Sequence, residues 1–157
     1  MTTNVYEAKL ALFDRLEEEA VAIGGWLNIF GADLPVQVAY EWPGEEAKLI
    51  CVYGGGVRLS QEDVVAEQGT LVRELALASV YIRVCSRPPV DVKITDAMCG
   101  AIAKGIGRTL KKNPDLGGGL TWSAIREGQG DYSRVDDEAV SILSLQLAIT
   151  SMFGYEV

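Results

Sequence analysis

Two segments of the chain carry apolar residues at helical spacing. Between Asn4 and Ile23 they recur every three or four positions, while Glu17–Glu19 occupy mostly the other face. Asn4 and Glu7 have the spacing of a capping box, and Gly24-Gly25 is a typical stop. This segment therefore predicts an amphipathic helix over 4–23.

The second segment runs from Val92 to Lys112, with an apolar residue every fourth position from Ile94 onward. Asp91 or Thr95 suits the start as a cap, and Asn113-Pro114 ends the run. Cations that favour the helix dipole gather towards the C-terminus: Lys104, Arg108, Lys111 and Lys112. We expect a second helix over 92–112.

Alternating apolar and polar residues predict the strands. Runs at 36–40 and 48–53 flank a turn at Trp42–Glu46, which predicts a hairpin. A long strand is expected at 71–85, although 71–78 could also be helical on propensity, and a further strand is expected at 120–127. One face of the long strand would hold Ala76, Ala78, Val80, Ile82 and Val84.

The clearest alternation closes the chain, at 138–153. One face of this last strand would carry Leu143, Leu145, Leu147 and Ile149. At about 3.3 Å per residue it would span roughly 50 Å, more than a small core requires. We therefore expect part of it to bend or project.

Two polar segments are predicted as loops. Gly54-Gly55-Gly56 interrupts the second β run, and 57–69 shows no clear period beyond a helical turn at 60–63. The other segment, 128–137, is rich in charged residues. With no linker or repeat, the element order predicts a single domain over 1–157 of the α/β (α+β) class. Its mostly antiparallel sheet would carry the two helices on one face.

Composition narrows the classes of function that the chain can have. The chain has a formal charge of −8 and no histidine. A negative domain repels phosphate, which disfavours sequence-specific nucleic-acid binding. The missing histidine removes the commonest general base and metal ligand. Cys51, Cys85 and Cys99 sit in apolar runs and predict reduced, buried thiols.

No motif supplies chemistry. The glycines of 100–107 lack the Gly-Lys-Ser/Thr ending of a phosphate loop and are expected to pack a helix on the sheet. The acidic segment from Asp131 departs from a calcium loop at Ser133 and Asp136. We therefore predict no catalytic residue, cofactor or metal. No apolar run of about 18 residues occurs and no signal peptide is recognised, so we expect a protein without a membrane span, in the cytoplasm of the producing cell.

This organisation resembles the tail terminator (tail completion) proteins of long-tailed, non-contractile bacteriophages. The resemblance spans nearly the whole chain and lies in length and element order. The segments that carry it are the helix ending near Gly24-Gly25, Pro35–Val38, Leu75–Val84, Asp96–Leu110, Asn113–Gly118, Asp131-Tyr132 and Ala139–Tyr155.

The resemblance implies a ring, expected to be a hexamer, that caps the tail tube, stops its polymerisation and presents a head-joining surface. The implied partners are further copies, the tail tube protein and a head-completion or neck protein. The protein would act in the virion tail or neck after assembly in the host cytoplasm. Six copies would carry 6 × −8 = −48, so DNA would pass the lumen without specific binding.

The two polar segments are the predicted contacts between subunits or with the tube, because loops on a rigid scaffold commonly bind partners. Their contact residues are Gly54, Gly55, Gly56, Arg58, Glu62, Asp63, Gln129, Asp131, Tyr132, Arg134, Asp136 and Asp137. Three alternatives stay open: another neck or connector protein, a small enzyme with converging carboxylates at Asp131, Asp136 and Glu138, and a ligand-binding domain with a large apolar pocket.

Overall fold

The computed structural model describes residues 5–21, 36–66, 69–86, 92–113, 122–135 and 138–154. Within these ranges the chain forms two helices, α1 (Val5–Val21) and α3 (Val92–Lys112), and a short 3-10 turn, η1 (Gly44–Glu46). The strands are β1 (Gln37–Ala39), β2 (Ile50–Ala66), β3 (Gly69–Ser86), β4 (Trp122–Val135) and β5 (Glu138–Gly154).

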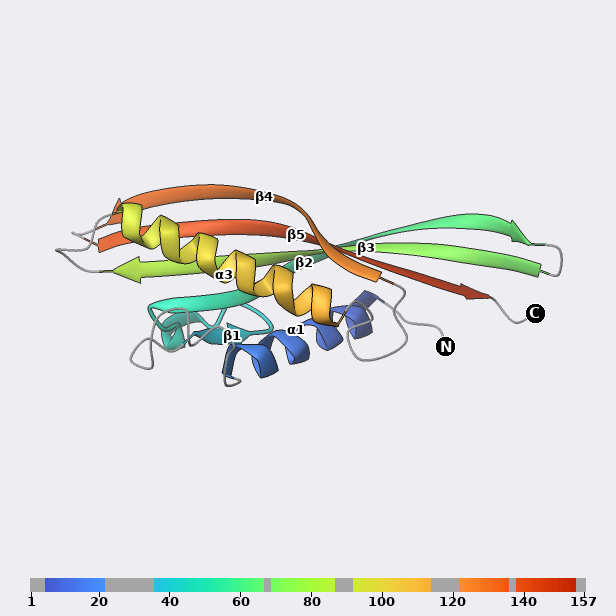
Figure 1. The fold of residues 1–157 in the computed structure, drawn as a ribbon, viewed down its shortest axis with the longest axis horizontal. Helices are drawn as coiled ribbons and strands as arrows, with labels where there is room; N and C mark the ends of the chain where they lie inside the picture. The colour runs from blue at the N-terminus through green and yellow to red at the C-terminus, as the bar shows by residue number, and fades with distance from the viewer. Residues whose placement is uncertain are drawn as a thin grey trace.

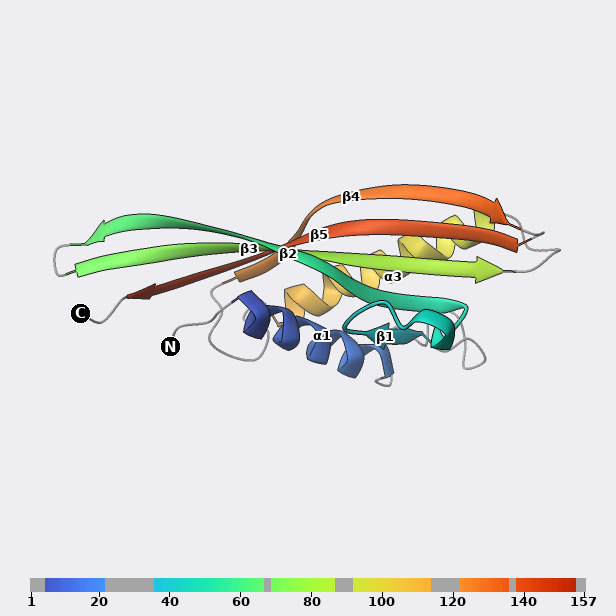
Figure 2. The same cartoon turned by 180° about the vertical axis from the view of Figure 1, so that it is seen from behind.

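The strands form one sheet in the order β1-β2-β3-β5-β4. Three of its four pairings are antiparallel, and β1 with β2 is parallel. Both helices lie on the same face of this sheet (Figures 1 and 2). The predicted fold class, a mostly antiparallel sheet with two helices on one face, is confirmed.

The core lies between the helices and this face. On β3, Val80 and Ile82 are fully buried, and the register places Leu145 and Leu143 of β5 opposite them. All five predicted inward residues of β3 and the predicted face of β5 belong to the core or pack against it. Both alternation predictions are therefore confirmed. The helices contribute Leu12, Leu16, Ile102 and Ile106, each fully buried.

The two predicted helices are confirmed, and α3 covers the expected residues. The capping role considered for Thr95 is wrong. Thr95 is the fourth residue of α3 and fully buried, and its Oγ1 lies 2.7 Å from Oγ of Ser141 on β5. Asn4, Gly24-Gly25 and Asp91 lie outside the described residues.

The hairpin predicted at 36–53 is wrong, because β1 runs parallel to β2, with Gln37 beside Cys51. The side chain of Gln37 explains the path of the connection. Its Oε1 accepts from the Lys48 amide at 2.8 Å, and its Nε2 donates to the Glu46 carbonyl at 3.4 Å. These bonds hold the returning chain beside the start of β1, so β2 begins in the same direction.

The loop predicted from Gly54 to Gly69 is also wrong, since β2 continues to Ala66 and pairs with β3 as far as Gly69. Only a register irregularity between Gly54 and Val57 marks the glycine triplet. The far half of this hairpin projects beyond both helices, and the end of β5 runs along it (Figure 1). We call residues 60–66, 69–75 and 150–154 the arm.

The second predicted loop, 128–137, is largely strand. β4 extends from Trp122 to Val135 and pairs with β5 along that length, with one extra residue at Arg126. β4 is an edge strand of the described sheet, and edge strands tolerate the glycines and charges that disguised this one. Asp136 and Asp137 lie outside the described residues.

Candidate assembly surfaces

Gly54 and Gly55 are packing positions rather than a flexible hinge. A Cβ on Gly54 would lie 2.4 Å from the Tyr40 carbonyl oxygen and 2.9 Å from Phe13 of α1. On the other side of the sheet, a Cβ on Gly55 would lie 2.5 Å from the Tyr81 ring. The two glycines therefore let α1 and Tyr81 approach β2 closely from opposite sides. Gly56 has open space around it.

Lys9 joins the cluster beside Gly54. This lysine of α1 is buried, and its Nζ lies 3.9 Å from the centroid of the Tyr40 ring. Burial lowers the pKa of Lys9, while the nearby Glu41 carboxylate acts in the opposite direction. The aromatic face gives the buried ammonium a favourable contact, so the cluster fixes α1 on the sheet.

The remaining predicted contact residues of the first segment lie on β2. Arg58 is exposed and stands opposite Leu77, at the base of the arm. Glu62 and Asp63 lie within the arm, opposite Arg73 and Val72. These residues are therefore carried by a hydrogen-bonded hairpin.

The second predicted segment lies at the opposite side of the sheet. Gln129 and Asp131 of β4 are exposed, and Tyr132 and Arg134 stand opposite Ser141 and Ala139 of β5. Since β3 and β5 lie between β2 and β4, the two segments are two strands apart across the sheet. Arg58 of the first segment lines a hollow of about 360 Å³ together with Glu127, the β4 residue that precedes the second segment.

That hollow lies on the face of the sheet opposite the helices, which we call the outer face. Register places Tyr53, Ser79, Tyr81, Arg83, Ser144 and Gln146 there. Neither of the described helices covers it (Figures 1 and 2). Gln146 donates to Ser79 Oγ at 3.0 Å, which ties β5 to β3 across this face.

Aromatic side chains occupy one end of the outer face. Tyr53 stacks on Tyr81 with centroids 5.2 Å apart, and Trp42 meets Tyr53 edge-on at 4.9 Å. The guanidinium of Arg83 lies 5.3 Å from the Trp42 ring, whose side chain is 45% exposed. Sequence reasoning did not identify this face. The polar residues that alternate with core residues on β3 and β5 were the available signal.

The carboxylates considered for an enzyme do not converge in the described structure. Asp131 stands opposite Ile142, whereas Glu138 stands opposite Val135. This four-residue offset corresponds to about 13 Å along the strands. No group of three or more Cys, Asp or Glu side chains among the described residues could hold a metal ion. Asp96 instead accepts from Ser141 at the start of α3.

All three cysteines are buried and free, as predicted. Burial raises the pKa of Cys51 to about 11 and that of Cys99 to about 12. Burial also raises the pKa of Cys85. A thiol held in its protonated form is a poor nucleophile, so these side chains act as core residues. Neither described helix is long and apolar enough to cross a membrane.

Comparison with known proteins gives a structural relationship only. No protein-family model matches the sequence, and no curated protein matches it. Among solved structures, a chain described as "Virion of native gene transfer agent (GTA) particle" has a similar fold, with a TM-score of 0.50 at 14% identity. The match covers 91% of this chain and 94% of that chain. At this identity the similarity shows a shared fold over nearly the full length of both chains.

Proposed function

We propose that this chain is a structural protein of a phage-like virion, and more specifically a tail terminator. In this role it forms a ring, expected to be a hexamer, that caps the tail tube, stops its polymerisation and offers the head-joining surface. The observation that carries the proposal is the fold shared along almost the whole chain with a protein of a virion particle. The resemblance of element order to tail terminators supports the finer role.

The open sheet edges support a ring. Among the described residues, β4 pairs only with β5, and β2 has no partner on its β1 side beyond Tyr53. Unpaired strand edges offer backbone donors and acceptors to another chain. Because these two edges differ, their contact would be heterologous, and heterologous contacts form a ring when the rotation between neighbouring copies closes.

Charge supports the passage of DNA. Each subunit carries −8, so six copies would carry 6 × −8 = −48. A lumen of like charge to DNA would let a genome pass without specific binding.

Size-exclusion chromatography with light scattering tests the ring. The protein should form a discrete oligomer at high concentration or when the tail tube protein of the same particle is added. Monomer alone under every condition, including saturating tube protein, would remove the proposal.

Another neck or head–tail connector protein is the second candidate, because the similar chain is described by its particle and not by its place in it. Pull-down against the tube protein and against the portal-side protein distinguishes the two. A terminator should retain the tube protein, whereas a connector should retain only the portal-side protein. An enzyme is disfavoured by the separation of Asp131 from Glu138 in the β4–β5 register.

A further inference from the structure

Helix α1 presents an acidic surface. It contains five acidic and two basic side chains, a net charge of 2 − 5 = −3. One basic residue, Lys9, is buried, and the other, Arg15, pairs with Glu18 at 3.0 Å. Asp14 and Glu17 are exposed. The solvent face of α1 is therefore more negative than its composition indicates.

Helix α3 has the opposite character. It contains five basic residues and one acidic residue, a net charge of 5 − 1 = +4. Five of the chain's 14 basic residues thus fall within its 21 positions, although the whole chain is at −8. The basic residues are all exposed: Lys93, Lys104, Arg108, Lys111 and Lys112. The single acid, Asp96, accepts a hydrogen bond from Ser141.

The two helices cover different sides of the sheet, counted across its strands. α1 packs over β1 and β2, whereas α3 packs over β3, β5 and β4. The acidic helix therefore lies towards one edge strand and the basic helix towards the other. If successive copies stand side by side in the same orientation, the side of one copy that carries α3 meets the side of the next copy that carries α1.

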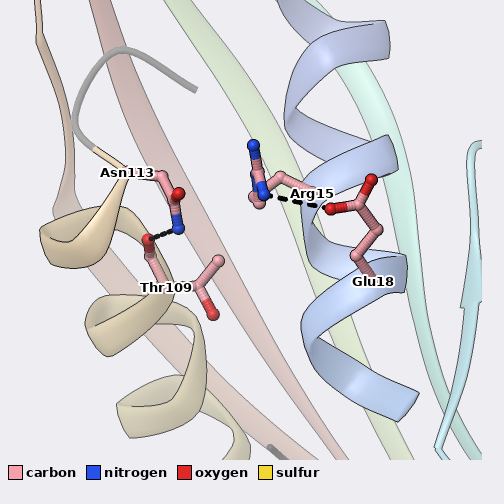
Figure 3. A network of polar contacts seen from close by, with 4 residues as sticks. All are labelled: Arg15, Glu18, Thr109 and Asn113. Atoms are coloured by element: carbon pink, nitrogen blue, oxygen red, sulfur yellow. Dashed lines mark hydrogen bonds and ion pairs between the residues drawn. The ribbon is translucent and has the colours of Figure 1, made fainter. Parts of the chain in front are cut away.

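Apolar side chains accompany the acidic residues on α1. Tyr6 is 69% exposed, Leu10 is 53% exposed and Val21 is 64% exposed. On a helical projection Tyr6 and Leu10 flank Glu17, on the side away from Arg15. Figure 3 shows Arg15 extending towards the α3 residues Thr109 and Asn113. The apolar and acidic flank is therefore turned away from α3 of its own subunit.

The α3 end has room to receive such side chains. A hollow of about 240 Å³ lies between α3 and the β4–β5 hairpin; its lining includes Cys99, Gly100 and Gly130 and also the acidic residues Asp96 and Asp131. A Cβ on Gly100 would meet no atom within 4 Å. Among the described residues, this hollow offers space for an apolar side chain such as Tyr6 or Leu10, whereas the acidic residues of α1 would have to face the exposed cations of α3.

We propose that copies of this chain associate head to tail, with the acidic and apolar flank of α1 in one copy seated against the basic face of α3 in the next. This inference rests on the proposed ring and names the surfaces that close it. Opposite charges across an interface steer association and fix its register. In a closed ring each basic helix would then lie between two acidic ones.

Paired charge reversal tests the proposal. One variant carries Asp14→Lys with Glu17→Lys, and another carries Lys104→Glu with Arg108→Glu. Each should weaken self-association, with tube protein present if the ring requires it, by at least about tenfold, because like charges would face each other. Combining all four substitutions restores opposite charges and should recover most of the association. Light scattering after size exclusion gives the oligomer, and circular dichroism checks that each variant folds.

Salt and a matched variant complete the test. Between about 0.1 M and about 1 M salt the Debye length falls from ~10 Å to ~3 Å, so the wild-type oligomer should weaken. Glu45→Lys with Glu46→Lys replaces two acids by two lysines on the exposed η1 turn, which is the same change in net charge as in the α1 variant. This control should leave the oligomer intact. Equal loss in this control, or no rescue in the combined variant, overturns the proposal.

The outcomes separate this inference from the proposed function. A ring that persists in both reversal variants leaves the terminator role standing and removes the α1–α3 contact. A wild-type protein that never forms a ring removes the function itself. If Lys104→Glu with Arg108→Glu abolishes binding to duplex DNA while the ring persists, α3 is a nucleic-acid surface and the proposal is wrong.

Discussion

The same two strands, β2 and β3, behave differently in their two halves. Under the helices β3 alternates strictly, with Val80, Ile82 and Val84 buried and Tyr81 and Arg83 partly exposed between them. In the arm the pairing continues without a break from Ser60–Leu75 to Ala66–Gly69. Neither of the described helices covers the arm (Figure 2). Alternation therefore marks a strand with one covered face, whereas hydrogen bonding alone defines the strand.

Thiol reactivity should give the largest contrast between the two halves. Burial raises the pKa of Cys99 from 9.0 to about 12, whereas a cysteine at exposed Ser60 would keep an ordinary pKa. In Ser60→Cys, the new thiol should react with iodoacetamide at pH about 8 roughly a thousandfold faster than Cys99. Mass spectrometry of peptides gives both rates in one sample.

The raised pKa of Cys99 also sets the direction in which stability changes at alkaline pH. The folded chain holds the Cys99 proton more tightly than the unfolded chain, whose thiol titrates near 9.0. The contribution of this thiol to stability is therefore complete below pH 9.0 and is lost as pH rises towards about 12. Alkylation of Cys99 in the native protein as fast as that of Ser60→Cys would contradict the predicted difference in reactivity, because it would mean that the covered half of the sheet opens as readily as the arm.

Core truncation should separate the halves by free energy. Ile82 is fully buried beneath the helices, while Leu59, at the base of the arm, is 44% exposed. Ile82→Ala should lower the free energy of unfolding by about 2–5 kcal/mol, because it leaves a cavity. Leu59→Ala should cost less than about 1 kcal/mol. Urea unfolding followed by fluorescence measures both, and similar costs would contradict the distinction.

The glycine triplet offers a matched pair at the junction of the halves. Gly54→Ala should cost about 1–3 kcal/mol, because the new Cβ would overlap the Tyr40 carbonyl and press on α1. Gly56→Ala meets no atom within 4 Å and should be neutral or stabilise by about 0.5–1 kcal/mol. Thermal unfolding of the two variants decides this. Equal effects in the two variants would contradict the packing role of Gly54.

These glycines show where sequence reasoning reached its limit. The helix over 92–112 and the alternating faces of β3 and β5 were predictable, because each buries one side against a core. Gly54 gave the signal of a loop, yet it is glycine because Tyr40 and Phe13 approach it. Those neighbours come from other elements, so no local pattern contains them.

The candidate surfaces were predictable in part for the same reason. Arg58, Gln129 and Asp131 were predicted as contact residues on loops; they are exposed, but they lie on strands, and their contact role stays a prediction. Spacing does not reveal that β1 runs parallel to β2, or that the Gln37 side chain bonds to the connection between them. The opposed charges of α1 and α3 stood in the sequence, but their meaning required the sheet order.

The smallest effect on stability should come from Arg58, and it tests what the arm is for. Arg58 is exposed at the base of the arm, so Arg58→Ala should change the free energy of unfolding by less than about 0.5 kcal/mol. If the arm serves assembly, the same variant should still weaken binding to the tube protein, since that contact is absent from the isolated subunit. Lys48→Ala removes an exposed cation from the β1–β2 connection and should alter neither quantity.

A loss of stability above about 1 kcal/mol in Arg58→Ala would mean that the base of the arm supports the fold. Unchanged stability with unchanged tube binding would exclude Arg58 from the contact and leave the arm without an assigned partner there.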